Sequence, residues 1–188
     1  MLYWAFLIIG ILGWFVVHLF KRWFPDARAK LGNPGKGFVA LGVIVSLVLI
    51  VVGYRGVDYI PVWQPPFFLT HLNNLLMLLA FYTYGASAAK GAKVWLGTKI
   101  RHPQLTGVKI WATAHLLVNG DLAAIILFGS MLAWAVISVI TINKAEGPWQ
   151  RPERAPIKKE IVLIGITIVL FTIVALIHNW LGVYPFGG

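Results

Sequence analysis

The chain has 188 residues, of which 59% are hydrophobic and only 12% are charged, and its mean hydropathy is +0.80. Soluble domains are about 45–50% apolar and about 25% charged, so this composition predicts an integral membrane protein without a large soluble domain. The absence of cysteine excludes disulfides, iron–sulfur clusters, thiolate zinc sites, cysteine nucleophiles and covalent c-type haem attachment. The net charge of +10 does not indicate nucleic-acid binding, because the basic residues lie between apolar runs.

Six apolar runs predict six membrane helices, and therefore an all-α, polytopic bundle that forms a single domain over residues 1–188. The first run carries its basic residues after it rather than before it, so we expect an anchor and not a cleavable signal. The residues between the last two runs include three prolines and predict an extended surface loop. The six runs are Leu2–Phe20, Gly37–Tyr54, Phe67–Ala89, Gln104–Val118, Leu122–Ile142 and Ile161–Leu181, and the loop is Asn143–Glu160.

Basic residues alternate between the connections. The first, third and fifth connections hold five, four and five of them, which is fourteen of the 16 Lys and Arg residues. The second connection holds only Arg55, and the short turn before Leu122 holds none. The positive-inside rule then places the three basic connections in the cytoplasm and both termini outside. The remaining base, Lys109, lies inside the fourth run, and we interpret it as snorkelling toward the interface.

The fourth run and its flanks carry an unusual concentration of polar groups for a membrane helix. Arg101, His102, Lys109, His115 and Asn119 all lie within nineteen positions. Ionisable side chains at membrane depth are costly, so they mark a candidate functional site. Two plainer interpretations apply nearby: an aspartate caps the fifth run, and two asparagines in the third run form hydrogen bonds across helices. These residues are Asp121, Asn73 and Asn74.

The chain has five histidines: His18, His71, His102, His115 and His178. His115 shares one helix face with Trp111 and Asn119, and Trp14 precedes His18 by the same spacing of four. An aromatic ring one turn before a histidine suits a flat apolar cofactor beside its axial ligand, whereas the alternative is that both side chains fill a helix interface. Histidine is the commonest metal-ligating side chain, and we predict that at least two of the five share a cofactor.

Spacing and depth limit which histidines can meet. His102 and His115 are separated by about 20 Å in rise and about 220° in azimuth on one helix, so they cannot bind one metal. Depth in the membrane favours His71 or His178 as the partner of His115, because all three lie toward the outer side. Pairing His18 with His115 requires a backbone offset of about 12 Å along the membrane normal. His102 is also explained as the entry to a helix that begins at a proline.

The polar segment resembles the signature of the NnrU family, a membrane family linked to denitrification and nitric-oxide metabolism and related to 15-cis-zeta-carotene isomerase. The resemblance extends over most of the chain. It rests on Arg101-His102-Pro103-x-x-x-Gly107, Trp111-x-x-Ala114-His115-Leu116-x-x-Asn119-Gly120, Val17-His18, Gly53-Tyr54-Arg55 and the tail Trp180–Gly188.

This resemblance implies a multi-pass protein of the bacterial inner membrane that binds haem b non-covalently. The positions of the two axial histidines in the isomerase relative match His18 and His115, and His71 is the alternative ligand. Expected partners are the lipid bilayer and either nitric oxide or a small apolar substrate; the resemblance assigns no catalytic residue. The residues expected to support the ligating histidines or to contact a substrate are Trp14, Trp111, Asn119, Arg101 and His102.

Two enzymatic alternatives remain open at this point. One is a redox-gated, haem-dependent cis–trans isomerase of an apolar polyene, similar to the carotene isomerase. The other is a membrane methyltransferase using S-adenosylmethionine, because Arg101-His102-Pro103-x-x-x-Gly107 also resembles the motif of that class. The methyltransferase pattern continues with an acidic, Tyr-rich segment. This chain has only Val183-Tyr184-Pro185 there, which argues against methyl transfer.

Overall fold

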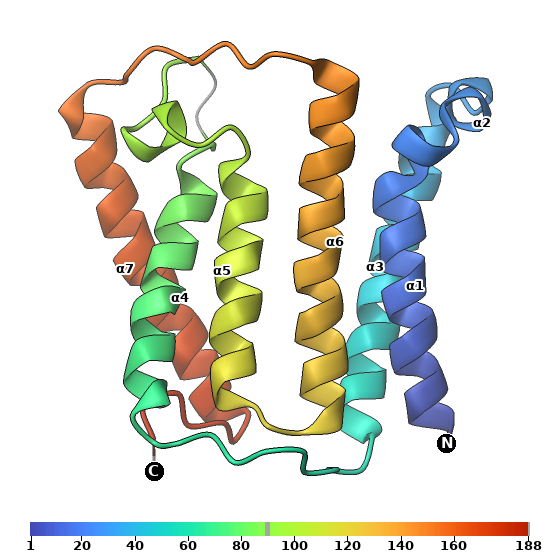
Figure 1. Cartoon of the computed structure of the whole chain (residues 1–188), viewed down its shortest axis with the longest axis vertical. Coiled ribbons are helices and arrows are strands. Elements are labelled where there is room, and N and C mark those ends of the chain that lie inside the picture. Colours follow the sequence, from blue (N-terminus) through green and yellow to red (C-terminus); the bar gives the residue numbers. More distant parts are fainter. Residues whose placement is uncertain (89–90, 188) are drawn as a thin grey trace. The chain divides into compact units, whose positions relative to one another are not determined.

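The computed structural model describes residues 1–88 and 91–187, and these residues are helical apart from their connections. The prediction of an all-α fold is confirmed, and each of the six apolar runs overlaps one long helix (Figure 1). A short helix and a 3-10 turn were not predicted. The elements are α1 (Leu2–Trp23), α2 (Pro25–Lys30), α3 (Pro34–Gly56), α4 (Leu69–Gly85), η1 (Leu96–Thr98), α5 (Pro103–Val118), α6 (Leu122–Glu146) and α7 (Ile157–Trp180).

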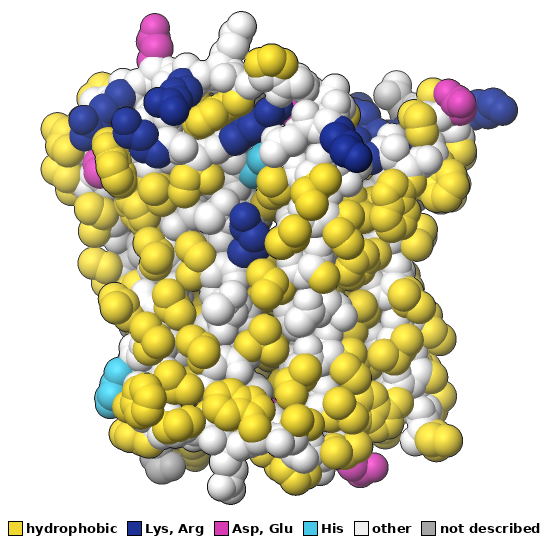
Figure 2. Space-filling view, in the orientation of Figure 1, with side chains coloured by type: hydrophobic (Ala, Val, Ile, Leu, Met, Phe, Trp, Pro, Cys, Tyr) yellow, Lys and Arg dark blue, Asp and Glu magenta, His cyan; other side chains and the backbone are white. Residues whose placement is uncertain are grey.

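Four of these helices are long and apolar enough to cross a membrane, namely α1, α3, α6 and α7. They make the chain a membrane protein by composition, and the flanks of the helices carry exposed hydrophobic side chains (Figure 2). With 17 and 16 residues, α4 and α5 have a length of about 24–26 Å, less than the hydrocarbon core of about 30 Å. It therefore stays a prediction that all six long helices span the membrane. The placement of both termini outside also stays a prediction.

Three predicted helix ends were wrong by four residues each. The apolar pattern predicts a third helix that extends to Ala89, which lies outside the described residues, but α4 ends at Gly85. The loop Asn143–Glu160 is shorter than expected: α6 continues to Glu146 and α7 begins at Ile157, directly after the N-cap Pro156. Gly147, with φ +66°, follows α6, a conformation in which glycine commonly ends helices.

The chain forms two compact units, residues 1–62 with 121–130 and residues 63–120 with 131–188. In the first unit α1 packs against α3 along a seam of small residues. A Cβ at Gly53 would lie 2.4 Å from the backbone nitrogen of Leu7, and one at Gly10 would lie 2.8 Å from that of Ile50. Only glycine at these positions lets the two backbones approach so closely.

The first unit also contains the beginning of α6. The Oδ1 of Asp121 accepts a hydrogen bond of 2.9 Å from the backbone nitrogen of Ala124, so the predicted cap is confirmed. The backbone nitrogen of Leu122 donates to the carbonyl of Ile60 at 2.9 Å, which fixes the helix start to the segment after α3.

In the second unit α4 packs against both α5 and α7. Gly107 of α5 faces α4, where a Cβ would lie 2.9 Å from the carbonyl oxygen of Ala80 and from the Cβ of Tyr84. A backbone bridge joins Lys93 to Arg154, and both connecting segments lie at the end of the unit where Lys and Arg side chains gather (Figure 2). At the opposite end of α4, the Nδ2 of Asn74 donates to the carbonyl of Pro185, so this asparagine contacts the C-terminal tail.

The glycine seam gives a testable expectation for stability. Gly53→Ala is expected to lower the free energy of unfolding by about 1–3 kcal/mol, because its methyl group meets backbone rather than a flexible side chain. The matched control is Gly37→Ala in the same helix, where a Cβ meets nothing within 4 Å. Thermal loss of helical circular dichroism in detergent is the measurement, and equal midpoints for the two variants would contradict the seam.

Candidate functional site

His115 lies half-buried in the last turn of α5 and is oriented by its own helix. Its Nδ1 lies 2.9 Å from the backbone carbonyl oxygen of Trp111, and the two rings are in contact at a centroid distance of 5.2 Å. A carbonyl oxygen only accepts, so Nδ1 carries the proton and donates. In the neutral imidazole the lone pair is then on Nε2, which is the arrangement typical of a metal-ligating histidine.

His18 in α1 has the same local geometry. Its Nδ1 donates to the carbonyl of Trp14 at 2.9 Å, and the two rings lie 4.1 Å apart with 34° between their planes. Both residues of each pair come from one helix, four positions apart, so the geometry follows directly from the α-helical repeat. We call these two pairs, Trp14–His18 and Trp111–His115, the Trp–His units.

The other side chain on the His115 stripe, Asn119, completes the end of α5. Its Nδ2 donates to the carbonyl oxygen of His115 at 2.8 Å, and its backbone nitrogen donates to the same oxygen at 3.0 Å. Asn119 therefore caps the helix at the turn that carries the histidine, and it holds the backbone of His115 rather than its ring.

The three remaining histidines differ from the Trp–His units. His178 in α7 also donates its Nδ1 to the carbonyl four residues earlier, at 2.8 Å, but that residue is Val174. The exposed ring of His71 meets Phe67 edge-on at 5.6 Å, and within the described ranges it makes no hydrogen bond. His102 is the N-cap residue of α5, as its position before a proline predicted.

Among the described residues no group of three His, Asp or Glu side chains is arranged to hold a metal ion. Trp14 and His18 belong to the first compact part of the chain, whereas Trp111 and His115 belong to the second. Pairing of His18 with His115, or of His71 with His115, stays a prediction.

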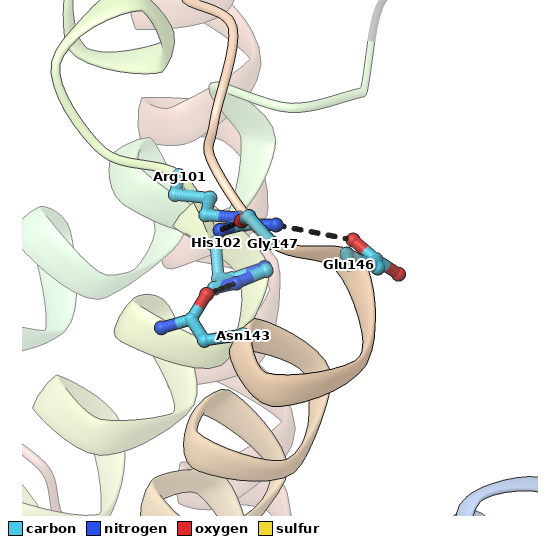
Figure 3. A network of polar contacts seen from close by, with 5 residues as sticks. All are labelled: Arg101, His102, Asn143, Glu146 and Gly147. Carbon is cyan, nitrogen blue, oxygen red and sulfur yellow. Dashed lines mark hydrogen bonds and ion pairs between the residues drawn. The ribbon is translucent and has the colours of Figure 1, made fainter.

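Arg101 and His102 form a polar network with the end of α6 (Figure 3). The His102 Nε2 lies 2.9 Å from the Asn143 Oδ1 and donates to it, the opposite proton assignment to that of the Trp–His units. An Arg101 Nη1 donates to the carbonyl of Gly147 at 2.6 Å, and Nη2 forms an ion pair of 3.5 Å with Glu146. The network joins the start of α5 to the last turn of α6, so both side chains have a structural role.

Sequence reasoning missed the partners in this network. Asn143 lies 41 residues from His102 and was placed in a loop rather than on a helix. No local spacing connects the two positions, and only the return of α6 to the start of α5 brings them together. The polar character of residues 143–146 was the single available signal, and it was interpreted as solvent exposure.

The fold and these sites define a class: a helical membrane protein with histidines oriented by their own helices. Comparison with protein-family models refines this to one family, described as NnrU protein, which matches residues 6–185. The chain belongs to the NnrU family, as its motifs predicted. The comparison with curated proteins gave no match, and neither did the comparison with solved structures.

The network at the start of α5 is testable by a double-mutant cycle. His102→Ala and Asn143→Ala each remove one partner of the same hydrogen bond, so the double variant should lose less stability than the sum of the two single variants. The expected coupling is about 0.5–1.5 kcal/mol, measured by reversible unfolding in detergent. Additive effects would show that the two side chains do not interact.

Proposed function

We propose that this NnrU-family protein binds haem b non-covalently, with the Nε2 atoms of His18 and His115 as axial ligands, and that it supports denitrification or nitric-oxide metabolism. The observation that carries the proposal is the repeated Trp–His unit. Both histidines donate Nδ1 to the carbonyl four residues earlier at 2.9 Å, and both rings contact the preceding tryptophan. Family membership supports the biological role.

The donor chemistry of these residues fits haem b. Two neutral imidazoles are the axial pair of many electron-transfer haems, and a chain without cysteine cannot attach the group through c-type thioether bonds. A porphyrin supplies four nitrogen ligands of its own, so the protein needs to provide only one or two. When bound, haem iron supplies one-electron redox chemistry and an affinity for diatomic gases such as nitric oxide.

The residues of the Trp–His units have separable roles. The carbonyl oxygens of Trp14 and Trp111 hold each imidazole ring in one orientation and keep the proton on Nδ1. The indole rings contact the imidazoles at centroid distances of 4.1 and 5.2 Å and add apolar surface beside them. His71 has the same ligating atoms but no backbone carbonyl to orient its ring within the described ranges, so it is the weaker candidate.

The proposal predicts how haem retention depends on each histidine. Full-length protein from haem-replete cells should contain haem in stoichiometric amount, with sharp absorption bands on reduction. His18→Ala and His115→Ala should each weaken haem affinity by at least about tenfold, because ligand loss exceeds the 10–100-fold effects known for outer-shell residues. The measurement is haem per polypeptide, determined by the pyridine haemochrome method.

His102→Ala is the matched control, because the Nε2 of His102 already forms a hydrogen bond with the Oδ1 of Asn143. Retention of haem in this variant and in His71→Ala is expected. A colourless wild-type protein would overturn the proposal. A coloured one that loses haem only with His71→Ala and His115→Ala would replace His18 by His71 as the ligand.

A further inference from the structure

A groove in the second unit carries a cation that the Trp–His units do not use. It has a volume of about 290 Å³ and lies between α4 and α5. Apolar side chains form most of its surface, and the polar atoms come from one lysine and two threonines. The lining residues are Leu76 from α4 and Thr106, Lys109, Ile110 and Thr113 from α5.

Lys109 is the informative residue of this groove. It is half-buried, and among the described residues it makes neither an ion pair nor a hydrogen bond. A primary ammonium surrounded by hydrocarbon is costly, and proteins normally neutralise it with an anion or carry it to water. Lys109 lines the groove, so an anion from outside the chain that enters the groove meets this residue.

The groove is independent of the proposed haem ligand on the same helix. The α5 residues of the groove recur at spacings of three, four and seven, which places them within one stripe about 100° wide. The stripe of Trp111, His115 and Asn119 is centred about 180° around the helix from it. A ligand in the groove therefore meets a different face of α5 from a ligand of His115.

The position of the groove identifies the kind of anion. Lys109 is the seventh residue of α5, about 9 Å along the axis from Pro103. That end of α5 adjoins the basic connections of the second unit, which carry Lys99 and Arg101. Basic pockets between membrane helices near an interface bind phospholipid head groups. The volume of about 290 Å³ lies just below the 300–1,000 Å³ typical of ligand pockets, so the groove holds only part of an acyl chain.

We propose that the α4–α5 groove is a binding site for an anionic phospholipid. The Lys109 ammonium and the hydroxyl group of Thr106, one turn earlier on α5, are donors suited to the phosphate oxygens, whereas Thr113 lies about 10 Å along the axis from Thr106. Leu76 and Ile110 line the apolar part of the groove, against which one acyl chain lies. Such a lipid neutralises the lysine and fills the face of α5 opposite to His115.

Native mass spectrometry of the full-length detergent-purified protein tests this site. The protein is titrated with phosphatidylglycerol, with zwitterionic phosphatidylcholine of the same chains, and with oleate. Wild type should prefer phosphatidylglycerol to phosphatidylcholine. Lys109→Gln should reduce that preference about fivefold, as expected for one lysine near a membrane surface. Lys109→Arg should keep it.

Lys99→Gln is the matched control, because Lys99 is exposed at the same end of the unit and does not line the groove. It should bind both lipids as wild type does, and all variants should keep the wild-type helical circular dichroism. The proposal is overturned if wild type shows no preference, or if Lys109→Gln leaves the preference unchanged. It is also overturned if only oleate binds in a manner that depends on Lys109, which would assign the groove to a fatty acid.

Discussion

The hydrogen bond from a histidine Nδ1 to the carbonyl one helical turn earlier is the interaction on which the candidate site depends. His18, His115 and His178 all make it, at 2.8–2.9 Å. In an apolar environment every polar group needs a partner inside the protein, and for an imidazole on a helix the nearest acceptor is the carbonyl at i−4. The same bond holds the ring orientation and keeps the proton on Nδ1, which leaves the lone pair of the neutral imidazole on Nε2. The tryptophans distinguish the first two histidines from the third.

The helix α5 carries three different features on different parts of its surface. Small residues such as Gly107 face α4 and permit close packing. The Trp111–His115 unit occupies one face and the Lys109 groove the opposite one. Its 16 residues are fewer than a membrane-spanning helix of ordinary composition requires, and its polar side chains occupy positions that a lipid-facing helix gives to hydrocarbon. The low apolar content that weakens its membrane signal is thus the direct result of the groups it carries.

Much of the fold follows from local sequence patterns. The six long helices were predictable because each contains a run of mostly apolar residues. Such a run can be recognised in the sequence without knowing which helices pack against it. The cap at Asp121 and the start at Pro103 were predictable for the same reason, since both depend on residues within one turn. The Trp–His units also follow from a spacing of four. What depends on distant residues was not predictable: Asn143 as the partner of His102, and Leu76 as the α4 wall of the groove. The helix end at Gly85 was missed because small, mostly apolar residues follow it in the sequence. The apolar run therefore extends beyond the end of the helix.

The central proposal is that His18 and His115 would together hold one haem. The most direct test is the electron paramagnetic resonance spectrum of the ferric protein, recorded for wild type, His18→Gly and His115→Gly, each with and without free imidazole. The account predicts a low-spin signal in wild type, a high-spin signal in either variant, and return of the low-spin signal when imidazole occupies the space of the missing side chain. A high-spin wild type, or a variant that stays low-spin without added imidazole, would contradict it.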